Sequence, residues 1–364
     1  MSESLRKIAL ILPLTGTAAE YGQTVRAGVE AALSEVAERI RPTLEVIDSN
    51  LLYSDSTADK ESVLNRLGKT DADVIIGPLL KSDLNAVFTA SNAQTPIIAL
   101  NTLPTTPAST RRVWQFGLRP EDEATSLVHC LKLQNRLNGI CLSLHNEWSQ
   151  RSQLAFKQAL DQAGGHVLFS QNIDLDSTDL NKLLASALGL SQSAHRKEAI
   201  ARITGLRLTS TARPSDQIQF ICVSGSALFG VQIRQQCRYL YADSIPMLGF
   251  SDLNSDNPLT NADLGGVYFT DAPWLINATE EIKKRRQSFQ NSRFQAFVNK
   301  RLFAMGLDAY RLAAAIVREA PDSEIAGVTG KLTITSSGLI ARTSALAQFS
   351  DDGDVLGLDH LPSI

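Results

Sequence analysis

KIALILPLTGTAAEYGQTVRAGVEAALSEV, residues 7–36, is the stretch that decides the fold of this chain. Its apolar run over residues 8–12 is closed by Pro13, which predicts an inner parallel strand with helices on both faces. After Gly22 the apolar residues recur on one helical stripe as far as Val36. The stretch therefore predicts a strand, a loop and a helix, in that order.

The same order of elements recurs along the chain. Residues 73–77 predict a strand, residues 78–82 a loop and residues 83–93 a helix. Further strands are expected at residues 44–48, 96–100, 139–144, 166–173, 217–223 and 244–249, with helices between most of them. This alternation is typical of doubly wound α/β lobes, whose ligands bind beyond the carboxyl ends of the strands. The sequence therefore predicts a binding cleft built from the loops that follow the strands.

Several phrases along the chain occur in the order of one known family. They are IGPLLK at residues 76–81, FGLRPEDEA at 116–124, PWL at 273–275, MGLDAYRLA at 305–313 and VTGKL at 328–332. Together with the opening strand and helix, they resemble the LppC/LpoA family of outer-membrane lipoproteins over nearly the whole chain. The resemblance covers the domain that looks like a type I periplasmic binding protein. It does not include the helical-repeat domain that precedes it in some members.

The resemblance implies an α/β fold of two Rossmann-like, doubly wound lobes joined by a hinge that the chain crosses three times. We place the crossings near residues 118–121, 249–252 and 330–335. One expected lobe is then residues 1–118 plus 250–331, and the other is residues 119–249 plus 332–364. Two lobes joined in this way can open and close around the hinge.

The family resemblance also implies a function. Its members lead us to expect a non-enzymatic periplasmic domain that contacts a class A penicillin-binding protein, the synthase that makes and cross-links peptidoglycan, and stimulates cross-linking. The alternative is a solute receptor of the ABC transport type, similar to those for leucine, isoleucine and valine, in which an amino acid or similar small polar ligand closes the hinge. The first strand fits both classes, whereas the phrases around Lys81, Glu121 and Asp308 favour the activator.

Candidate cleft residues follow the strand ends in both expected lobes. Helix starts and hydroxyl groups there would hold a carboxylate, and Trp148 or Tyr21 would cover an apolar part of a ligand. Amino-acid receptors of this fold carry small hydroxyl residues in two loops where this chain has Leu80-Lys81 and Asn101-Thr102, and a lysine there opposes an ammonium group. For every candidate the alternative role is loop capping. The candidates are Thr15, Tyr21, Gly22, Leu80, Lys81, Asn101 and Thr102 in the first lobe and His145, Asn146, Trp148, Ser149, Ser224, Gly225 and Ser226 in the second.

One long connection, residues 177–216, separates two expected core strands. Long connections in compact domains tend to be functional or mobile. The segment resembles an insertion in the LppC/LpoA family that carries basic residues just before a strand. We therefore expect Arg207 and Arg213 to contact the partner, with a solvated helical excursion as the alternative.

Charge and motif content argue against several other classes of protein. A net charge of −3 gives no general attraction for nucleic acid, and no apolar run approaches the roughly 18 residues that cross a membrane. The basic run at residues 283–286 follows two glutamates and is typical of a solvated helix face. Walker A, dinucleotide-binding, zinc-protease and Gly-x-Ser-x-Gly motifs are all missing. We expect no enzyme activity, no cofactor and no metal.

The start of the chain is acidic and polar, and no cysteine for lipid attachment follows its first apolar run, so we expect no signal peptide within it. Family members are exported lipoproteins. The resemblance therefore implies a periplasmic domain that is anchored to the outer membrane in the full-length form, with the signal and anchor outside this chain. A natural cytoplasmic protein that begins at Met1 is the alternative.

The cysteines lack metal-ligand spacing and are expected to be small buried hydrophobes. If a disulfide forms, the pairs to test are Cys130 with Cys141 and Cys222 with Cys237, which lie on neighbouring predicted elements.

Overall fold

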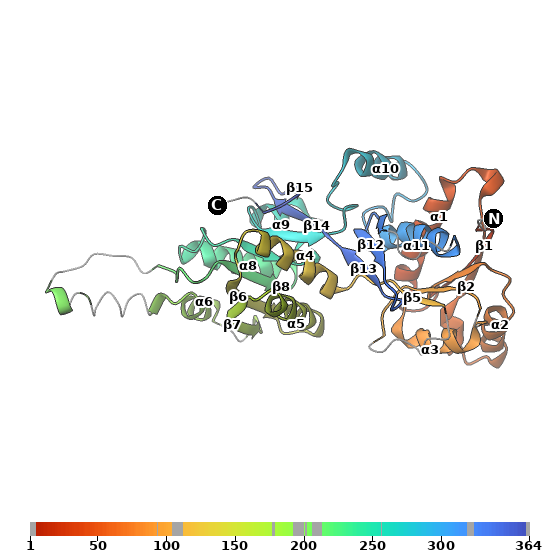
Figure 1. The fold of residues 1–364 in the computed structure, drawn as a ribbon, viewed down its shortest axis with the longest axis horizontal. Coiled ribbons are helices and arrows are strands. Elements are labelled where there is room, and N and C mark those ends of the chain that lie inside the picture. The colour runs from red at the N-terminus through yellow and green to blue at the C-terminus, as the bar shows by residue number, and fades with distance from the viewer. Residues whose placement is uncertain are drawn as a thin grey trace. The chain divides into compact units, whose positions relative to one another are not determined.

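Two units make up the chain, each built on its own mainly parallel sheet (Figure 1). Unit 1 comprises Met1–Arg119 and Ala272–Thr343, and unit 2 comprises Pro120–Asp271 and Ser344–Ile364. The chain therefore passes between the units at three places. The computed structural model describes residues 5–92, 94–103, 112–176, 179–191, 200, 202–205, 213–255, 257–318 and 324–361.

In the described part of unit 1, five parallel strands form the main sheet in the order β2-β1-β3-β4-β5. They are β1 (Lys7–Leu12), β2 (Thr43–Asp48), β3 (Val74–Ile76), β4 (Ile97–Ala99) and β5 (Val113–Gln115). Alternate residues of β1 face two cores: Ile8 and Leu10 contact the core of α1 (Ala19–Ser34) and α11 (Arg301–Val317), and Ile11 that of α2 (Thr57–Gly68) and α3 (Lys81–Ala90). Both faces of β1 are covered, as its apolar run predicts.

Helices α1 and α11 pack closely because each presents a glycine to the other. A Cβ atom on Gly28 would lie 2.1 Å from the Phe303 carbonyl oxygen, and one on Gly306 would lie 2.2 Å from the Val25 carbonyl oxygen. Neither position has room for a side chain. The second residue of the MGLDAYRLA phrase, Gly306, therefore sets the distance between two core helices.

The rest of unit 1 is a second, antiparallel sheet and several short helices. The sheet has the order β11-β12-β13, and Leu332, Ile334 and Ile340 from it pack into the core that contains α11. The elements are β11 (Glu324–Ala326), β12 (Lys331–Ile334), β13 (Ile340–Thr343), α10 (Glu280–Gln290) and the 3-10 helices η1 (Glu38–Ile40) and η2 (Ser49–Tyr53).

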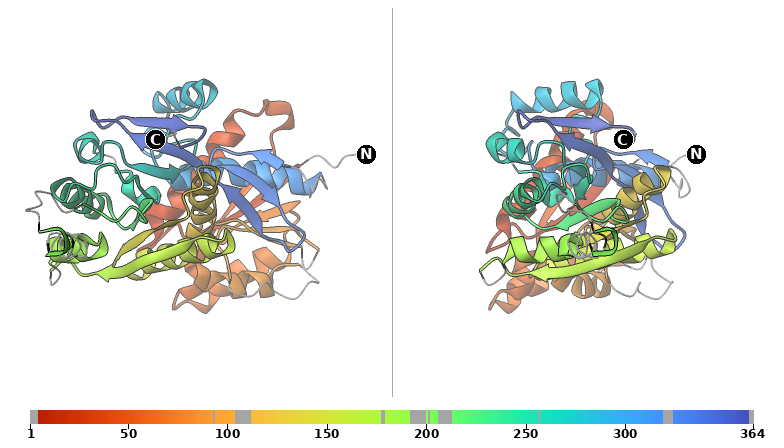
Figure 2. Two further views of the ribbon diagram at one scale, coloured as in Figure 1. Left: turned by 60° about the vertical axis from the view of Figure 1, so that its left-hand side comes forward. Right: turned by 90° about the vertical axis from the view of Figure 1, so that its left-hand side faces the viewer.

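The sheet of unit 2 has the order β15-β14-β10-β9-β8-β6-β7 among the described residues. The strands from β6 to β10 are parallel, β14 and β15 are antiparallel additions, and β7 forms one edge (Figure 2). The strands are β6 (Asn138–Leu144), β7 (His166–Ile173), β8 (Phe220–Ser224), β9 (Met247–Gly249), β10 (Tyr268–Asp271), β14 (Ala345–Phe349) and β15 (Val355–Leu358). The helices of unit 2 include α4 (Pro120–Leu133), α5 (Glu147–Gln162), α6 (Leu180–Ala187), α8 (Ala227–Tyr239), α9 (Pro258–Asp263) and the 3-10 helix η3 (Ser251–Leu253).

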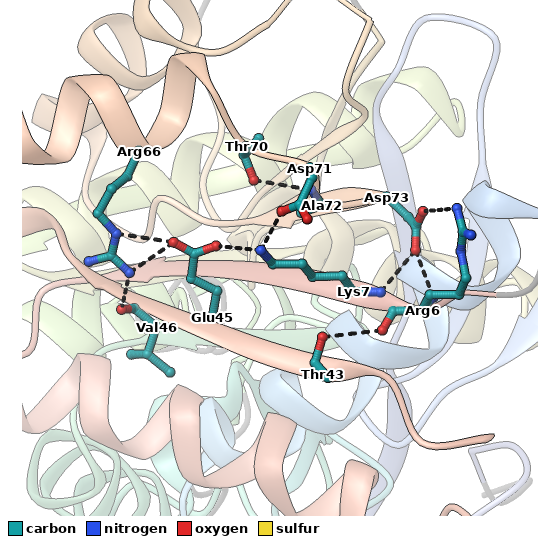
Figure 3. Close-up of polar contacts among 10 residues, drawn as sticks. All are labelled: Arg6, Lys7, Thr43, Glu45, Val46, Arg66, Thr70, Asp71, Ala72 and Asp73. Atoms are coloured by element: carbon teal, nitrogen blue, oxygen red, sulfur yellow. Dashed lines mark hydrogen bonds and ion pairs between the residues drawn. The ribbon is translucent and has the colours of Figure 1, made fainter. Parts of the chain in front are cut away.

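The amino end of the unit 1 sheet is closed by charged residues that bond to one another, as Figure 3 shows. Lys7 Nζ lies 3.1 Å from the Glu45 carboxylate and also bonds Asp71. Glu45 accepts a second contact, from Arg66 Nη2 at 3.0 Å. Asp73 accepts hydrogen bonds at 2.6 and 2.9 Å from two backbone N–H groups at the start of β1. Hydrogen bonds to Asp71 and then to Glu45 raise the pKa of Lys7. We call these five residues the ion-pair edge.

Each strand that the sequence predicts before residue 250 is present, with bounds shifted by a few residues. The sequence missed β5, β10 and the strands after β10, because they are short or draw their partners from distant segments. Within the insertion, the structure describes helix α6 (Leu180–Ala187).

Two of the three expected crossings between the lobes are wrong. β10 pairs in parallel with β9 and antiparallel with β14, so residues 250–271 belong to unit 2, and the chain leaves that unit after Asp271. β12 and β13 pack on the core of unit 1, so the last passage follows Thr343 and lies beyond residues 330–335. The first passage lies between Arg119 and Pro120.

Candidate functional site

The loop after β1 is organised by Asp48, the last residue of β2. Its carboxylate accepts from the Leu14 N–H at 2.9 Å and from the Thr15 hydroxyl at 2.7 Å. The Thr15 oxygen in turn accepts from Asn50 Nδ2 at 3.2 Å. The hydroxyl that the sequence assigns to a ligand is thus engaged within the loop itself.

The neighbouring candidates Gly22 and Tyr21 differ in role. A Cβ atom on Gly22 would lie 1.9 Å from the Pro13 carbonyl oxygen, so glycine permits α1 to approach the end of β1. Tyr21 is 57% exposed on the first turn of α1. Gly22 is therefore a packing residue, and Tyr21 is available for contact.

The loops after β3 and β4 are tied together by Asn101. Its Nδ2 donates to the Leu79 carbonyl oxygen at 2.9 Å, and its Oδ1 accepts from the Thr102 N–H at the same distance. Leu80 stands immediately before α3, and Lys81 is the exposed first residue of that helix. Among the described residues the Lys81 ammonium has no ion-pair or hydrogen-bond partner.

A buried carboxylate that the sequence does not reveal lies beside Lys81. Asp83 is fully buried in the first turn of α3, and its Oδ1 accepts from the Tyr53 hydroxyl at 2.9 Å and the Ser82 hydroxyl at 2.8 Å. Its Oδ2 has no hydrogen-bond partner among the described residues. Burial, with the Asp83 carboxylate acting in the same direction, raises the pKa of Tyr53. Only the tertiary contact with Tyr53 distinguishes this aspartate from an ordinary first-turn residue.

In unit 2 the candidate loops also cap helices. The Asn146 carboxamide accepts from the Ser149 N–H at 2.9 Å at the start of α5, and the Ser226 hydroxyl accepts from the Phe229 N–H at 3.4 Å at the start of α8. A Cβ atom on Gly225 would lie 2.6 Å from the Phe229 ring, so this glycine is also a packing residue. The remaining candidate in the first of these loops, His145, is exposed.

Trp148 belongs to a short chain of charged and aromatic contacts. The Arg151 guanidinium lies 5.8 Å from the centre of the Trp148 ring and donates to both oxygens of Glu121, at 2.8 and 3.0 Å. Trp148 remains 43% exposed. Glu121, from the FGLRPEDEA phrase, is therefore linked to the candidate cleft residue Trp148 through its bidentate ion pair with Arg151.

Polar side chains line up across the carboxyl ends of three neighbouring strands of unit 2. Ser143 on β6 pairs in register with Ser224 on β8, and its hydroxyl donates to Asn172 Oδ1 on β7 at 2.8 Å. Ser224 is 1% exposed, and its hydroxyl has no hydrogen-bond partner among the described residues. A buried hydroxyl without a partner at this edge is the kind of group that a small polar ligand would engage.

Asp308, which lies in the MGLDAYRLA phrase, is a structural anchor. It is fully buried on α11 and accepts from the Val328 N–H at 2.9 Å, and from the Thr329 N–H and hydroxyl at 2.7 Å each. Burial raises the pKa of Asp308, against the effect of these hydrogen bonds. Asp308 therefore holds the loop before β12 in place, and its carboxylate is not exposed on the surface.

A pocket of about 890 Å³ lies at the amino end of the unit 2 sheet. We call it the amino-edge pocket. Its lining includes Arg213, the last basic residue of the insertion, together with Arg136 and Tyr241. The other expected partner contact, Arg207, lies outside the described residues. The full lining is residues 134–136, 213–216, 218–219, 241 and 244–246.

All four cysteines are free, and the two that stand opposite each other are not one of the pairs that we proposed to test. Cys141 on β6 stands opposite Cys222 on the adjacent strand β8. Both are buried in the unit 2 core, and burial raises the pKa of Cys222 well above its usual value and that of Cys237 to about 12. Within the described residues these thiols pack as small hydrophobes.

Comparison with known proteins now identifies the family. A family model described as "LppC putative lipoprotein" matches residues 2–352. The chain belongs to the LppC family. A curated relative of this family, penicillin-binding protein activator LpoA from Photobacterium profundum, is 26% identical over 96% of this chain and 56% of its own length. The chain therefore spans about half the length of the curated LppC relatives it matches.

Solved structures agree with the predicted fold class. The C-domain of LpoA from Haemophilus influenzae, described as a regulator of PBP1A, is 20% identical with a TM-score of 0.67, and the alignment covers 97% of this chain and 99% of that one. A leucine-binding protein from Thermotoga maritima is 17% identical with a TM-score of 0.53, over 97% of this chain and 98% of that one. The LppC chain thus has the α/β fold of type I periplasmic binding proteins, and the expected family and fold are confirmed.

No described helix has the length and apolar content to span a bilayer. No group of three or more histidine, cysteine, aspartate or glutamate side chains is placed to hold a metal ion in the described part of the chain.

Proposed function

We propose that this chain is the module of a penicillin-binding protein activator that binds a class A penicillin-binding protein and raises its cross-linking activity. The observation that carries the proposal is the LppC match across residues 2–352, together with curated relatives named penicillin-binding protein activator. In this proposal the chain is a non-enzymatic periplasmic domain, joined in the full-length protein to an outer-membrane lipid anchor.

The hydrogen bonds within the loops at the strand ends favour this function over binding of a small ligand. Thr15, Asn101, Asn146 and Ser226 all use their polar groups to hold their own loops or helix starts. A receptor would keep such groups for its ligand. Lys81 places a positive charge where an amino-acid receptor would hold an ammonium group, which weakens that function further.

Activation requires that the chain binds two conformations of the synthase with different affinity. A module that binds the active and the inactive conformation equally shifts nothing, however tightly it binds. A tenfold preference for the active conformation stabilises that conformation by about 1.4 kcal/mol. The chemistry of cross-linking stays in the synthase, and the activator supplies binding energy alone.

The test is direct binding of this chain to the periplasmic part of the class A penicillin-binding protein of the same organism, at physiological salt so that a loose charge attraction is screened. We expect saturable binding together with faster cross-linking by the synthase. Absence of binding contradicts the proposal, and binding without stimulation contradicts its activator part.

A solute receptor is the second candidate, favoured by the buried Ser224 hydroxyl that lacks a partner among the described residues. If a small polar ligand engages this group, an amino acid that binds there would raise the melting temperature of the chain in a concentration-dependent way, and a screen of amino acids would find it. A Ser224→Ala variant would lose that response, whereas Ser226→Ala serves as the control for a general change in the loop. If the wild-type chain shows no thermal shift with any amino acid, the receptor function is contradicted.

A further inference from the structure

The amino-edge pocket lies where three chain segments lead into neighbouring strands of unit 2. Residues 134–136 precede β6, residues 213–219 precede β8 and residues 241–246 precede β9. Because β8 lies between β6 and β9, the three segments border one stretch of the same sheet edge. Receptors of this fold bind ligands at the carboxyl edge. The pocket is therefore a separate surface, at the amino ends of the unit 2 strands and not at their carboxyl ends.

The walls of the pocket are held in place by side-chain hydrogen bonds. The Gln219 carboxamide oxygen accepts from the Leu137 N–H at 2.8 Å and the Asn138 N–H at 2.9 Å, which joins the segment before β8 to the segment before β6. Gln134 Nε2 donates to the Leu361 carbonyl oxygen at 2.9 Å. A pocket fixed in this way loses little conformational entropy when a partner binds.

Two helices end at this pocket with a residue in the left-handed conformation. Asn135 has a φ of 53° after α4, and Tyr241 has a φ of 56° after α8. Both turns have the hydrogen bond of a Schellman motif, in which the Ala242 N–H, for example, donates to the Cys237 carbonyl oxygen at 2.8 Å. Helix α5 ends in the same type of turn with Gly164, the residue type that this conformation favours.

The tyrosine in this turn is not explained by the fold. A bulky residue in the left-handed region is an outlier, and glycine would adopt the turn with less strain. Core packing does not compensate, because Tyr241 is 73% exposed. Strained residues gather at functional sites. The position of Tyr241 is therefore better suited to contact with another molecule than to the stability of unit 2.

The charges in the pocket indicate which chemistry that molecule carries. Arg136 and Arg213 line it, with Asp216 as the acidic lining residue, so cations outnumber anions. The half-buried Arg136 guanidinium has no ion-pair or hydrogen-bond partner within the part of the chain that the structure describes. Guanidinium groups bind carboxylates in a bidentate geometry, and arginine and tyrosine are enriched among the residues that dominate interface energies.

We propose that the amino-edge pocket is the docking site for an acidic segment of the synthase. An aspartate or glutamate of that segment pairs with Arg136 and Arg213, and Tyr241 packs against its apolar part. This inference rests on the proposed function, since it gives the synthase a place on the chain.

The experiment measures the Kd of this chain for the periplasmic part of the synthase with three variants. Arg136→Ala is expected to raise the Kd about tenfold and Arg136→Glu about 100-fold, because the second change also repels a carboxylate. Tyr241→Gly is expected to raise the Kd about tenfold while the melting temperature stays at or above that of the wild type. A variant that folds better and binds worse separates contact from structure.

The matched control is Asn277→Gly in unit 1. Asn277 is another described non-glycine residue in the left-handed region, with a φ of 49°, and it does not line the pocket. Its replacement relieves the same kind of strain and is expected to leave the Kd within twofold of the wild type.

The outcomes distinguish the two proposals. If the wild type binds and all three pocket variants bind within twofold of it, the pocket assignment is overturned and the activator function stands. If the wild type does not bind, the activator function is overturned and the docking site falls with it. Loss of binding in the pocket variants but not in Asn277→Gly supports both.

Discussion

The amino edges of the two parallel sheets differ in how their charges are used. In unit 1 the ion-pair edge is closed on itself: Lys7 bonds Glu45 and Asp71, and Glu45 also contacts Arg66 (Figure 3). In unit 2 the same edge is a pocket of about 890 Å³, in which Arg136 has no charged partner among the described residues. Equivalent positions in two similar sheets thus carry paired and unpaired charge.

The difference teaches how to separate structural charge from charge that is available for a partner. Polar groups that bond one another at a sheet edge contribute to the fold, and few of their hydrogen-bond donors and acceptors remain available for a partner. A guanidinium beside a strained, exposed tyrosine contributes little to the fold and retains its donors. Substitutions at the ion-pair edge should therefore change stability, and those at the amino-edge pocket should change binding.

Charge reversal at the two edges gives the largest expected contrast. Arg136→Glu should weaken synthase binding by about 2.7 kcal/mol, the equivalent of a 100-fold change in Kd, and leave unfolding nearly unchanged. Arg66→Glu should lower the free energy of unfolding by about 1 kcal/mol through repulsion from Glu45, with no change in Kd. Denaturant unfolding measures the free energy of unfolding of each variant, and calorimetric titration measures its Kd for the synthase. An equal loss of binding in the two variants would remove the distinction.

Removal of the Asp73 carboxylate should have the next largest effect. Asp73→Ala leaves two backbone N–H groups at the start of β1 without their acceptor, so we expect the free energy of unfolding to fall by about 1–2 kcal/mol. Synthase binding should not change. Equilibrium urea unfolding tests the first value, and Asp71→Ala is a control that removes an exposed carboxylate without exposing backbone donors.

Tyr241→Gly should act in the opposite direction on stability. Glycine adopts the left-handed turn after α8 without strain, so we expect the free energy of unfolding to rise by about 0.5–1 kcal/mol. The gain should be visible as a higher melting temperature in the absence of the synthase. A lower melting temperature would show that the Tyr241 side chain supports the fold and would assign it to structure.

The smallest effect is a pH dependence at the ion-pair edge. Partial burial alone would raise the pKa of Glu45, but hydrogen bonds from Lys7 and Arg66 bring it below its ordinary value. A lowered folded-state pKa gives stability that is present above the unfolded pKa of about 4.3 and is lost as the pH falls through the folded value. The difference in unfolding free energy between wild type and Glu45→Gln should therefore shrink below pH 4. A difference that grows with acid would contradict the pairing.

Local patterns were sufficient to predict the fold class but not the unit boundaries. The run over residues 8–12 predicts a strand covered on both faces because every one of its side chains is apolar, and β1 is buried there. The pairing of Tyr268 with Gln348 joins segments that no local pattern connects. Local patterns alone therefore place residues 250–271 in the wrong lobe.

The candidate site was predictable in place and not in role. Position after a strand is a local property, and it located Thr15 and Asn146 in the loops at the strand ends. Whether a hydroxyl is available depends on its partner, and the partner of Thr15 is Asp48, 33 residues away. The conformation of Tyr241 has no sequence signal, because the chain carries tyrosine where the usual sign of this turn is glycine.

Hydrogen exchange of this chain with and without the periplasmic part of the synthase tests the central claim most directly. The account predicts protection at residues 134–136 and 241–246, which border the amino-edge pocket, and unchanged exchange at the ion-pair edge around Lys7 and Glu45. Protection at the ion-pair edge, or in the loops after β1 and β6 alone, would contradict it.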